Sequence, residues 1–194
     1  AVRDLGHDDL PALQALFQAN PDYFVRVGGQ PPGPNEARQA FDERPPAHLG
    51  FRQRWFAGVV DGAGALRGLL ILLSDFTAPG VWHIALFLLD DTTRGTGAAA
   101  RLHAALQAWA QAAGARWLRL GVVVGNLPAE RFWARCGYQA VRTRPFVADS
   151  GQTLVSRVMV KPLPLPLPGH DPVASSLASY LALVPRDAPG STLP

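Results

Sequence analysis

The chain has little cysteine and no long apolar run. Its 194 residues contain a single cysteine, Cys136, so no disulfide can form within the chain. No stretch combines a basic start with a long apolar run, as a signal peptide or a membrane span would. We therefore expect a cytoplasmic protein with no membrane partner.

Charged residues are also scarce, at 17% of the chain, and lysine is almost absent. The net charge of +3 comes from arginines that are spread along the sequence rather than gathered in a cluster. Because proteins that bind nucleic acid usually carry a basic cluster, we expect no nucleic-acid partner. The hydrophobic content of 48% is ample for one buried core in a chain of this length.

The apolar patterns predict a mixed α/β fold. Strand patterns lie at 1–6, 52–60, 66–73, 81–89, 116–124, 138–147 and 153–160, and helical patterns at 10–17, 35–42, 97–113 and 126–135. The Asp-Gly-Ala-Gly turn at 61–64 predicts an antiparallel hairpin. The nearly continuous apolar run 81–89 predicts a central strand, and the helix that follows it predicts a crossover to a parallel neighbour.

Two segments are expected to lack regular structure. Residues 20–34 are full of turn formers and predict a loop. After residue 161, alternating proline and leucine predict an extended spacer, followed by a short amphipathic helix at 172–184 and ten disordered residues. The sequence thus divides into a domain over 1–161 and a tail over 162–194. Within the domain, His103 is expected on a solvated face of its helix.

The segment 94–99, Arg-Gly-Thr-Gly-Ala-Ala, is typical of an anion-binding turn between a strand and a helix. Its glycines let the backbone turn tightly, so that free N–H groups and the positive end of the helix dipole point at one spot. Arg94 adds a cation, which suits a pyrophosphate. A dinucleotide site would need glycine at position 100, which is alanine, and no Gly-Lys-Ser/Thr follows as in a P-loop.

A second motif follows at 126–138. The two motifs together resemble those of the GCN5-related N-acetyltransferase (GNAT) superfamily. Its acyl-CoA signature, Arg/Gln-x-x-Gly-x-Gly/Ala, is matched by Arg94, Gly97 and Ala99. Its second pattern, Asn-x-x-Ala-x-x-Phe-Tyr-x-x-x-Gly-Phe, is matched at Asn126, Ala129, Phe132, Gly137 and Tyr138. The resemblance covers about residues 1–161, and the proline-leucine tail has no counterpart in it.

The resemblance implies a central mixed, mostly antiparallel sheet of about six to seven strands, flanked by helices, with a splayed parallel pair at the CoA site. It implies transfer of an acetyl group from acetyl-CoA to a primary amine of a small molecule or peptide, by direct attack in a ternary complex and without a metal. The tail and the apolar strands raise the possibility of a homodimer, which is common among similar proteins.

The resemblance also implies the residues that bind CoA. The turn would hold the pyrophosphate, and the main chain of the strand before it would pair with the pantetheine arm. The next motif would contact the CoA arm, and the alternatives are that Asn126 is a helix cap and Trp133 a packing residue. The expected CoA-binding residues are Leu88, Leu89, Arg94, Gly95, Thr96, Gly97, Ala98, Ala99, Asn126, Phe132 and Trp133.

The catalytic groups are left open, because the chain departs from the family pattern at two places. Trp133 stands where many members have a tyrosine acid, and an indole N–H does not yield its proton. Alanine and leucine at 85 and 86 replace the acids that many relatives place on the central strand. Asp75 can attract a cationic amine or simply form a turn, and His83 can accept a proton or be a core histidine.

The acceptor is likewise not identified by any motif. Tyr23, in the loop at 20–34, is expected either to contact the acceptor or to pack against the domain. The acidic residues of the region 20–46 would suit a cationic acceptor if they are not merely solvated charges. Two other functions stay open. One is a CoA-binding regulatory module that has lost catalysis, and the other is a nucleotide-binding module that uses the same turn.

Overall fold

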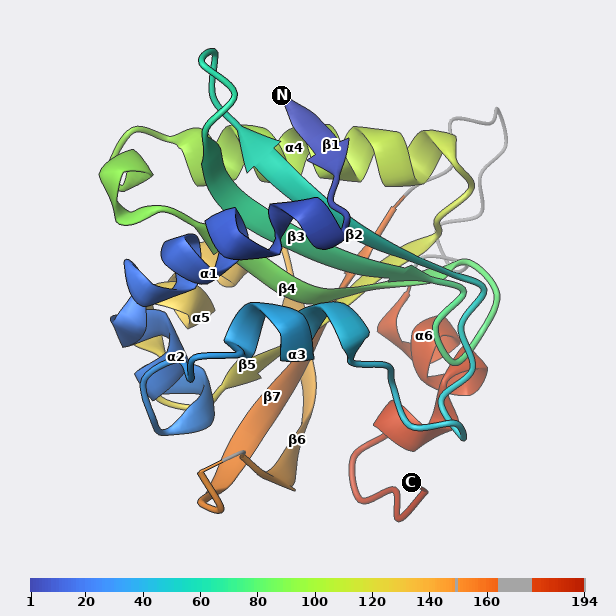
Figure 1. Cartoon of the computed structure of the whole chain (residues 1–194). Coiled ribbons are helices and arrows are strands. Elements are labelled where there is room, and N and C mark those ends of the chain that lie inside the picture. Colours follow the sequence, from blue (N-terminus) through green and yellow to red (C-terminus); the bar gives the residue numbers. More distant parts are fainter. Residues whose placement is uncertain (149, 164–175, 194) are drawn as a thin grey trace.

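The computed structural model describes residues 1–148, 150–163 and 176–193. In these residues the strands form one seven-stranded sheet with the order β1-β2-β3-β4-β5-β7-β6 (Figure 1). Neighbouring strands in this described sheet are antiparallel, except for the parallel pair β4 and β5. The strands are β1 Val2–Asp4, β2 Gln53–Val60, β3 Leu66–Ser74, β4 Val81–Leu89, β5 Trp117–Val123, β6 Gln139–Val147 and β7 Thr153–Pro162.

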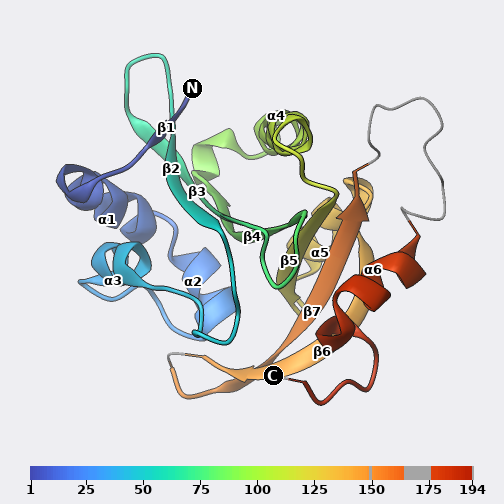
Figure 2. The same ribbon diagram turned by 90° about the vertical axis from the view of Figure 1, so that its right-hand side faces the viewer.

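Helices cover both faces of the sheet. Figure 2 shows α1, α2 and α3 on one side of β2, β3 and β4, and α4 on the other. The segment around α6 lies beside β6 and β7. The helices are α1 Leu10–Gln18, α2 Pro21–Gly28, α3 Glu36–Asp42, α4 Ala98–Ala112, α5 Leu127–Arg135 and α6 Leu177–Leu183, with short 3-10 turns at His7–Asp9, Asp91–Thr93 and Pro185–Asp187.

The alternation of side chains along the central strands divides the core between the two faces. Trp82, Ile84 and Leu118 pack under α4 and α5, in one cluster with Leu106. On the opposite face, one cluster forms between β2, β3, β4 and the helices α1 to α3. A third cluster lies under α6 and includes Val81. In it the Tyr180 ring packs against the Trp117 ring, with 5.1 Å between ring centres. The segment around α6 therefore covers the same face as α1 to α3, over β5, β7 and β6.

A β-bulge interrupts the middle of β4. The register between β3 and β4 shifts between Ile71 and Leu72, so that Ala85 has no cross-strand partner in β3. As a result Ile84 and Phe87, three residues apart, both pack toward α4 and α5. Bulges bend a strand and re-aim its side chains, and they are common beside active sites.

Most of the predicted elements are present, but the predicted loop at 20–34 is wrong. Its first half forms α2, in which Pro21 occupies the first turn, where its missing N–H costs nothing. Phe24 anchors the helix through an edge contact with the Phe17 ring, 4.8 Å between ring centres. Gly29, with φ of 81°, then ends it. Apolar packing here outweighs the turn-forming composition.

Two further expectations are wrong. His103 is 4% exposed rather than solvated, and its Nε2 lies 3.1 Å from the Tyr138 hydroxyl. The final residues are not disordered over 185–193, because Asp187 is fully buried. Residues 164–171 of the predicted spacer and residues 172–175 of the predicted next helix lie outside the described residues.

Tyr180 offers a test of how firmly the segment around α6 is docked. Its side chain is fully buried, whereas Leu183 in the same helix is 40% exposed. Removing a buried aromatic side chain costs about 3–5 kcal/mol, so Tyr180→Ala should lower the free energy of unfolding by that amount in urea titration. Leu183→Ala is the control and should change it by less than about 0.5 kcal/mol. Equal effects of the two substitutions would contradict the docking.

Candidate functional site

The sheet opens in its middle, where β4 and β5 stop pairing. Their parallel ladder runs only from Val81 and Trp117 to Ile84 and Leu120. Beyond that point β4 continues to Leu89 and β5 to Val123 without pairing to each other. Residues 85 and 121 are exposed although both strands are central. The predicted splayed pair is therefore present, and it leaves two strand edges whose backbone groups can bond an extended ligand.

The glycine turn follows directly after this opened end of β4. Gly95 and Gly97 have φ of 73° and 75°, the left-handed region in which glycine is favoured. In the described part of the chain, their N–H groups have no hydrogen-bond acceptor. Gly97 is the N-cap of α4, so the positive end of that helix adds to the free N–H groups. The turn thus fits a phosphate-bearing ligand.

Side chains brace this turn from within. Asp90 accepts a hydrogen bond from the Thr92 N–H at 2.8 Å, and the Thr96 hydroxyl donates to the Thr93 carbonyl at 2.7 Å. Arg94 forms an ion pair with Asp91 and is well exposed. Its guanidinium is therefore within reach of an anion that approaches the turn.

The second motif lies on the β5 side of the opening. Asn126 is the N-cap of α5, and its Oδ1 accepts from the Ala129 N–H at 3.5 Å. The Phe132 ring lies 5.9 Å from that of Phe87, at the opened part of β4. Trp133 is buried against His103 and Tyr138, so packing accounts for its position. Leu88 turns its side chain into the cluster under α1 to α3, which leaves only its backbone for a ligand.

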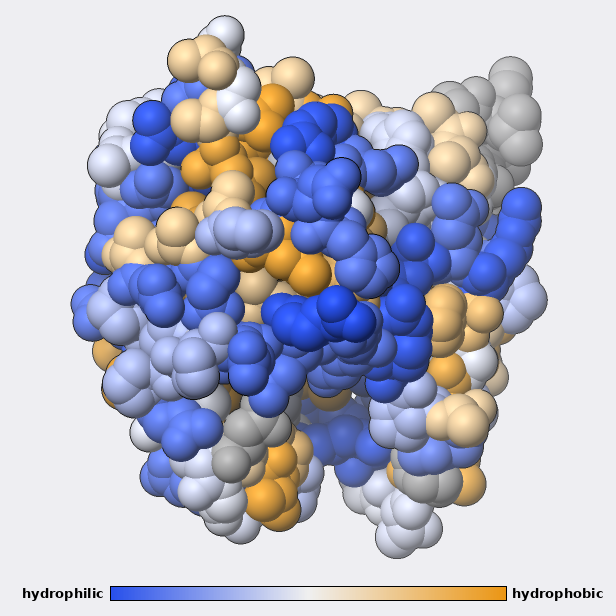
Figure 3. Space-filling view, in the orientation of Figure 1, coloured by the Kyte–Doolittle hydropathy of each residue, from blue (hydrophilic) through white to orange (hydrophobic). Residues whose placement is uncertain are grey.

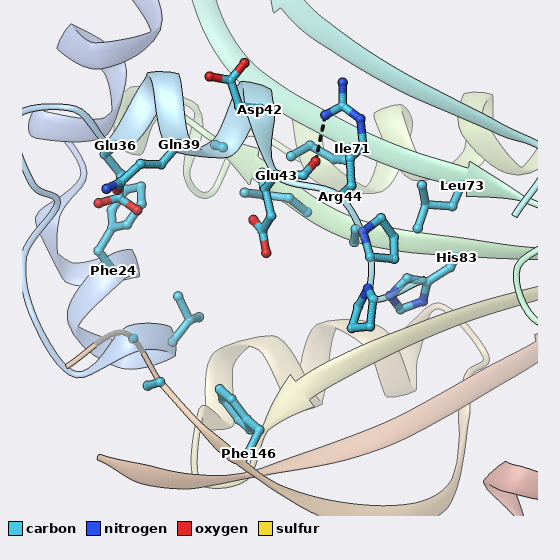
Figure 4. A pocket seen from close by; sticks show the side chains of 18 of the residues that line it. Phe24, Glu36, Gln39, Asp42, Glu43, Arg44, Ile71, Leu73, His83 and Phe146 are labelled. Carbon is cyan, nitrogen blue, oxygen red and sulfur yellow. Dashed lines mark hydrogen bonds between the residues drawn. The ribbon is translucent and has the colours of Figure 1, made fainter. Parts of the chain in front are cut away.

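A cavity of about 1230 Å³ lies on the face of the sheet that α1 to α3 cover. Figure 3 shows a hollow below α3, between the end of the β6–β7 hairpin and the C-terminal segment. Side chains from α2, α3, β3, β4 and the β6 end form its wall, among them Tyr23, Phe24, Glu36, Glu43, Arg44, Arg54, Ile71, Leu73, His83, Ala85, Leu86 and Phe146 (Figure 4). The bulge residue Ala85 is thus accessible from this face.

Acidic and basic groups share the wall of the cavity. Figure 4 shows the Glu43 carboxylate directed into the open space, while Asp42 points away from it. The two arginines are held by backbone carbonyls: Arg44 donates to Phe41 at 2.8 Å and Arg54 to Ala40 at 2.7 Å. Burial lowers the pKa of Arg54. Glu43 therefore presents a carboxylate to a cationic ligand in the cavity.

Tyr23 lies in this cavity wall, as expected of an acceptor contact, although it comes from a helix rather than a loop. Burial raises the pKa of its hydroxyl to about 12. The phenol is therefore neutral at physiological pH and can only donate or accept a hydrogen bond.

His83 lines the same cavity, two residues before the bulge. Its ring stacks on Phe76 with 4.6 Å between ring centres, and its Nδ1 lies 3.2 Å from both the carbonyl oxygen and Nη1 of Arg119. Burial and the Arg119 cation lower the pKa of His83 to about 3. The ring is thus neutral at physiological pH, and it is too weak a base to keep a proton taken from an ammonium group.

Asp75 lies elsewhere. Its Oδ1 accepts from the Gly80 N–H at 2.7 Å, and its other oxygen is 3.8 Å from Arg52. It lines a smaller hollow beside Trp55 and Trp82 rather than the large cavity. The structure therefore does not bring Asp75 and His83 together, and the contacts of Asp75 are those of a turn-forming residue.

Sequence reasoning missed a buried ionic cluster behind His83. Arg119 of β5 is paired with Asp187, which follows α6, through bonds of 2.7 and 3.0 Å. The Tyr180 hydroxyl donates to the same carboxylate at 2.6 Å. No sequence signal marks this cluster, because its members are separated by up to 68 residues.

Cys136 is half-buried at the end of α5, and burial raises the pKa of its thiol. Within the residues that the structure describes, no group of three or more histidine, cysteine or acidic side chains is placed to hold a metal ion. Among the helices of those same residues, none is long and apolar enough to cross a membrane.

The family model described as "Acetyltransferase (GNAT) family" matches residues 13–138. No curated protein matches the chain in sequence. Among solved structures, the ribosomal-protein-S18-alanine N-acetyltransferase from Escherichia coli is similar with a TM-score of 0.60 and 17% identity, over 87% of this chain and 96% of that one.

Two further solved structures share the fold. A spermidine N-acetyltransferase from Vibrio cholerae, in complex with CoA and spermine, has a TM-score of 0.63 and 18% identity, over 82% of this chain and 93% of that one. A GCN5-related N-acetyltransferase from Kribbella flavida has a TM-score of 0.60 and 24% identity, over 84% of this chain and 97% of that one. At these identities the similarity shows the fold alone, which agrees with the predicted fold class.

The two buried histidines predict a loss of stability in mild acid. Burial and the Lys161 charge lower the pKa of His103 to about 4, and that of His83 is about 3. Both values lie below those of an unfolded chain, so protons bind the unfolded state first and stability falls as the pH drops from about 6.5 toward 4. Each histidine should contribute up to roughly 1.4 kcal/mol per pH unit.

Urea titration at pH 7 and pH 5 measures this loss. His103→Gln should flatten the dependence of the unfolding free energy on pH, because one of the two groups no longer titrates. An unchanged slope in this variant would contradict the buried, neutral state of His103.

Proposed function

Because the chain belongs to the acetyltransferase (GNAT) family, we propose that it transfers an acetyl group from acetyl-CoA to a primary amine of a small molecule or peptide. The neutral amine attacks the thioester carbonyl directly, in a complex that holds both substrates. The bond from carbon to sulfur breaks, and the proton given up by the nitrogen leaves on the CoA thiol. We assign this activity to the domain over residues 1–161.

The observation that carries the proposal is the meeting of two features at the end of β4. The strand edge after Ile84 is unpaired, and the turn with the free N–H groups of Gly95 and Gly97 follows it. An extended pantetheine arm suits the first feature and a pyrophosphate suits the second. Backbone groups of Leu88 and Leu89 would bond the arm, together with Asn126 and Phe132 across the opening.

The cavity on the opposite face supports an amine acceptor. Ala85 is exposed toward it at the bulge, so a ligand in the cavity can meet one that lies in the opening. Glu43 gives the wall a negative charge that attracts an ammonium group. The similar structures include enzymes named for a protein alanine and for spermidine, which are both amines.

The chain's own groups mainly position the reactants. Acetyl-CoA supplies an activated thioester with a good leaving group, so little acid catalysis is required. His83 is neutral and serves as a hydrogen-bonding group rather than as a base that stores the proton. Trp133 is buried in the core and gives no acid, and Asp75 lies outside the cavity. Holding the two substrates together is therefore the main source of rate that we propose.

Release of free thiol from acetyl-CoA with a panel of amines tests the activity. Turnover with any primary amine supports it. Tight CoA binding without turnover on any amine would instead favour a catalytically inactive CoA-binding regulatory module. Binding of NAD or ATP in preference to CoA would favour a nucleotide-binding module.

Gly97→Trp tests the CoA site. A side chain here would occupy the space above the free N–H groups, so CoA binding should be lost while the fold survives. Gly64→Trp is the matched control, because it also has a positive φ, of 82°, in the exposed turn between β2 and β3. Isothermal titration with CoA compares the two variants. Normal CoA affinity of Gly97→Trp would exclude the proposed site.

Glu43→Gln tests the acceptor side. Removing the negative charge from the cavity wall should raise the KM for a dicationic amine about tenfold, as expected for the loss of one charge-assisted contact. The dissociation constant of CoA should not change. Asp22→Asn is the control, since this carboxylate is exposed on α2 and does not line the cavity. Equal KM values for the two variants would refute the role of Glu43.

A further inference from the structure

We propose that Arg119 and Asp187 are positioning residues of the acceptor site, which hold His83 with its ring proton on Nε2, so that a hydrogen-bond donor faces the acceptor. This inference rests on the proposed function, because it assigns the cavity to the amine substrate. It gives the segment 176–193, which has no counterpart in the family pattern, a part in the site without lining the cavity.

The first step is the orientation of the Arg119 guanidinium. Its Nε and Nη2 donate to the two oxygens of Asp187, at 2.7 and 3.0 Å. Both side chains are buried, with 7% and 0% of their surface exposed. A two-point pair of this kind fixes the plane of the guanidinium, so the direction of the remaining nitrogen, Nη1, is set as well.

The carboxylate itself is held in place by a third donor. The Tyr180 hydroxyl donates to Oδ2 of Asp187 at 2.6 Å. Burial would raise the pKa of Asp187, but its hydrogen bond and charge interaction with Arg119 outweigh this and lower it. Asp187 is therefore ionised, as the pairing requires.

The second step is the tautomer of His83. Nη1 of Arg119 lies 3.2 Å from Nδ1 of the histidine ring. The guanidinium is always protonated and can only donate, so a proton on Nδ1 would face another donor. The Arg119 carbonyl, also at 3.2 Å, would accept from a protonated Nδ1, but the bond from the cation is the stronger of the two. The ring therefore accepts at Nδ1 and carries its proton on Nε2.

The third step is the direction in which the ring presents that proton. Phe76 stacks on one face of the His83 ring, at 4.6 Å, and also lies against Arg119, whose guanidinium carbon is 5.3 Å from the Phe76 ring centre. These contacts fix the plane of the ring. In the described part of the chain no hydrogen-bond partner meets Nε2, and His83 lines the acceptor cavity. The Nε2–H group is thus free to bond an oxygen or nitrogen atom of the acceptor.

The tautomer can be measured without turnover. In protein labelled with ¹⁵N-histidine, long-range ¹H–¹⁵N spectra distinguish a proton on Nε2 from one on Nδ1, and His83→Asn identifies the signals of this ring. We expect the Nε2–H form in the wild-type protein at pH 7. The Nδ1–H form would overturn the proposal.

Arg119→Lys tests the positioning. Lysine keeps the charge beside Asp187 but lacks the second nitrogen that reaches His83, so the Nδ1–H form, bonded to the carbonyl of residue 119, should appear. The kcat/KM for the amine should fall roughly three- to tenfold, as expected for one hydrogen bond, with an unchanged dissociation constant for CoA. Arg3→Lys is the matched control, because Arg3 makes a similar two-point pair with Asp9 at the surface.

Asp187→Asn serves as a second variant if Arg119→Lys does not fold, and it should also mix the two tautomers. A changed tautomer with kcat/KM equal to that of Arg3→Lys would refute the role in the acceptor site. Absence of thiol release by the wild-type protein with every amine would refute acetyl transfer and this acceptor role together. That outcome can be told apart from a failure of the positioning role alone, because the spectra report the tautomer of His83 independently of activity.

Discussion

Both halves of the site depend on the loss of pairing between β4 and β5. A continuous ladder would bury the backbone of both strands and leave no edge for a ligand. Pairing ends after Ile84 and Leu120, and the bulge at Ala85 lies at the same level of β4. The opening therefore joins two surfaces that a closed sheet would separate, the one beside the glycine turn and the one with the large cavity.

The buried pair of Arg119 and Asp187 is an expensive way to attach a helix. Each ion loses several kcal/mol of hydration on burial, and apolar side chains of similar size can often replace such a pair without loss of stability. Here three donors, two nitrogens of Arg119 and the Tyr180 hydroxyl, all bond the carboxylate of Asp187. An arrangement of this kind sets directions rather than adding stability, which agrees with its location behind His83, a residue of the cavity wall.

The sequence predicts the turn and the cap of the candidate site better than it predicts the cavity, for physical reasons. The turn at 94–99 and the cap at Asn126 are local, so the residue types alone specify them. The fold class, the central place of β4 and the hairpin after β2 follow from patterns of short range. By contrast, α2 depends on the packing of Phe24 on Phe17, and the burial of His103 depends on Tyr138, 35 residues later. Contacts between distant segments leave no mark on a local pattern.

The distance along the chain between Arg119 and its partner also bears on how the protein is made. Asp187 is added to the growing chain 68 residues after Arg119. At a synthesis rate of about 5–20 residues per second, the interval is on the order of 3–14 s, which is long compared with the folding time of a small domain. During that interval a buried cation would have no counter-charge, so this face of the sheet must stay open to water. The segment that carries Asp187 is thus the one that closes this face.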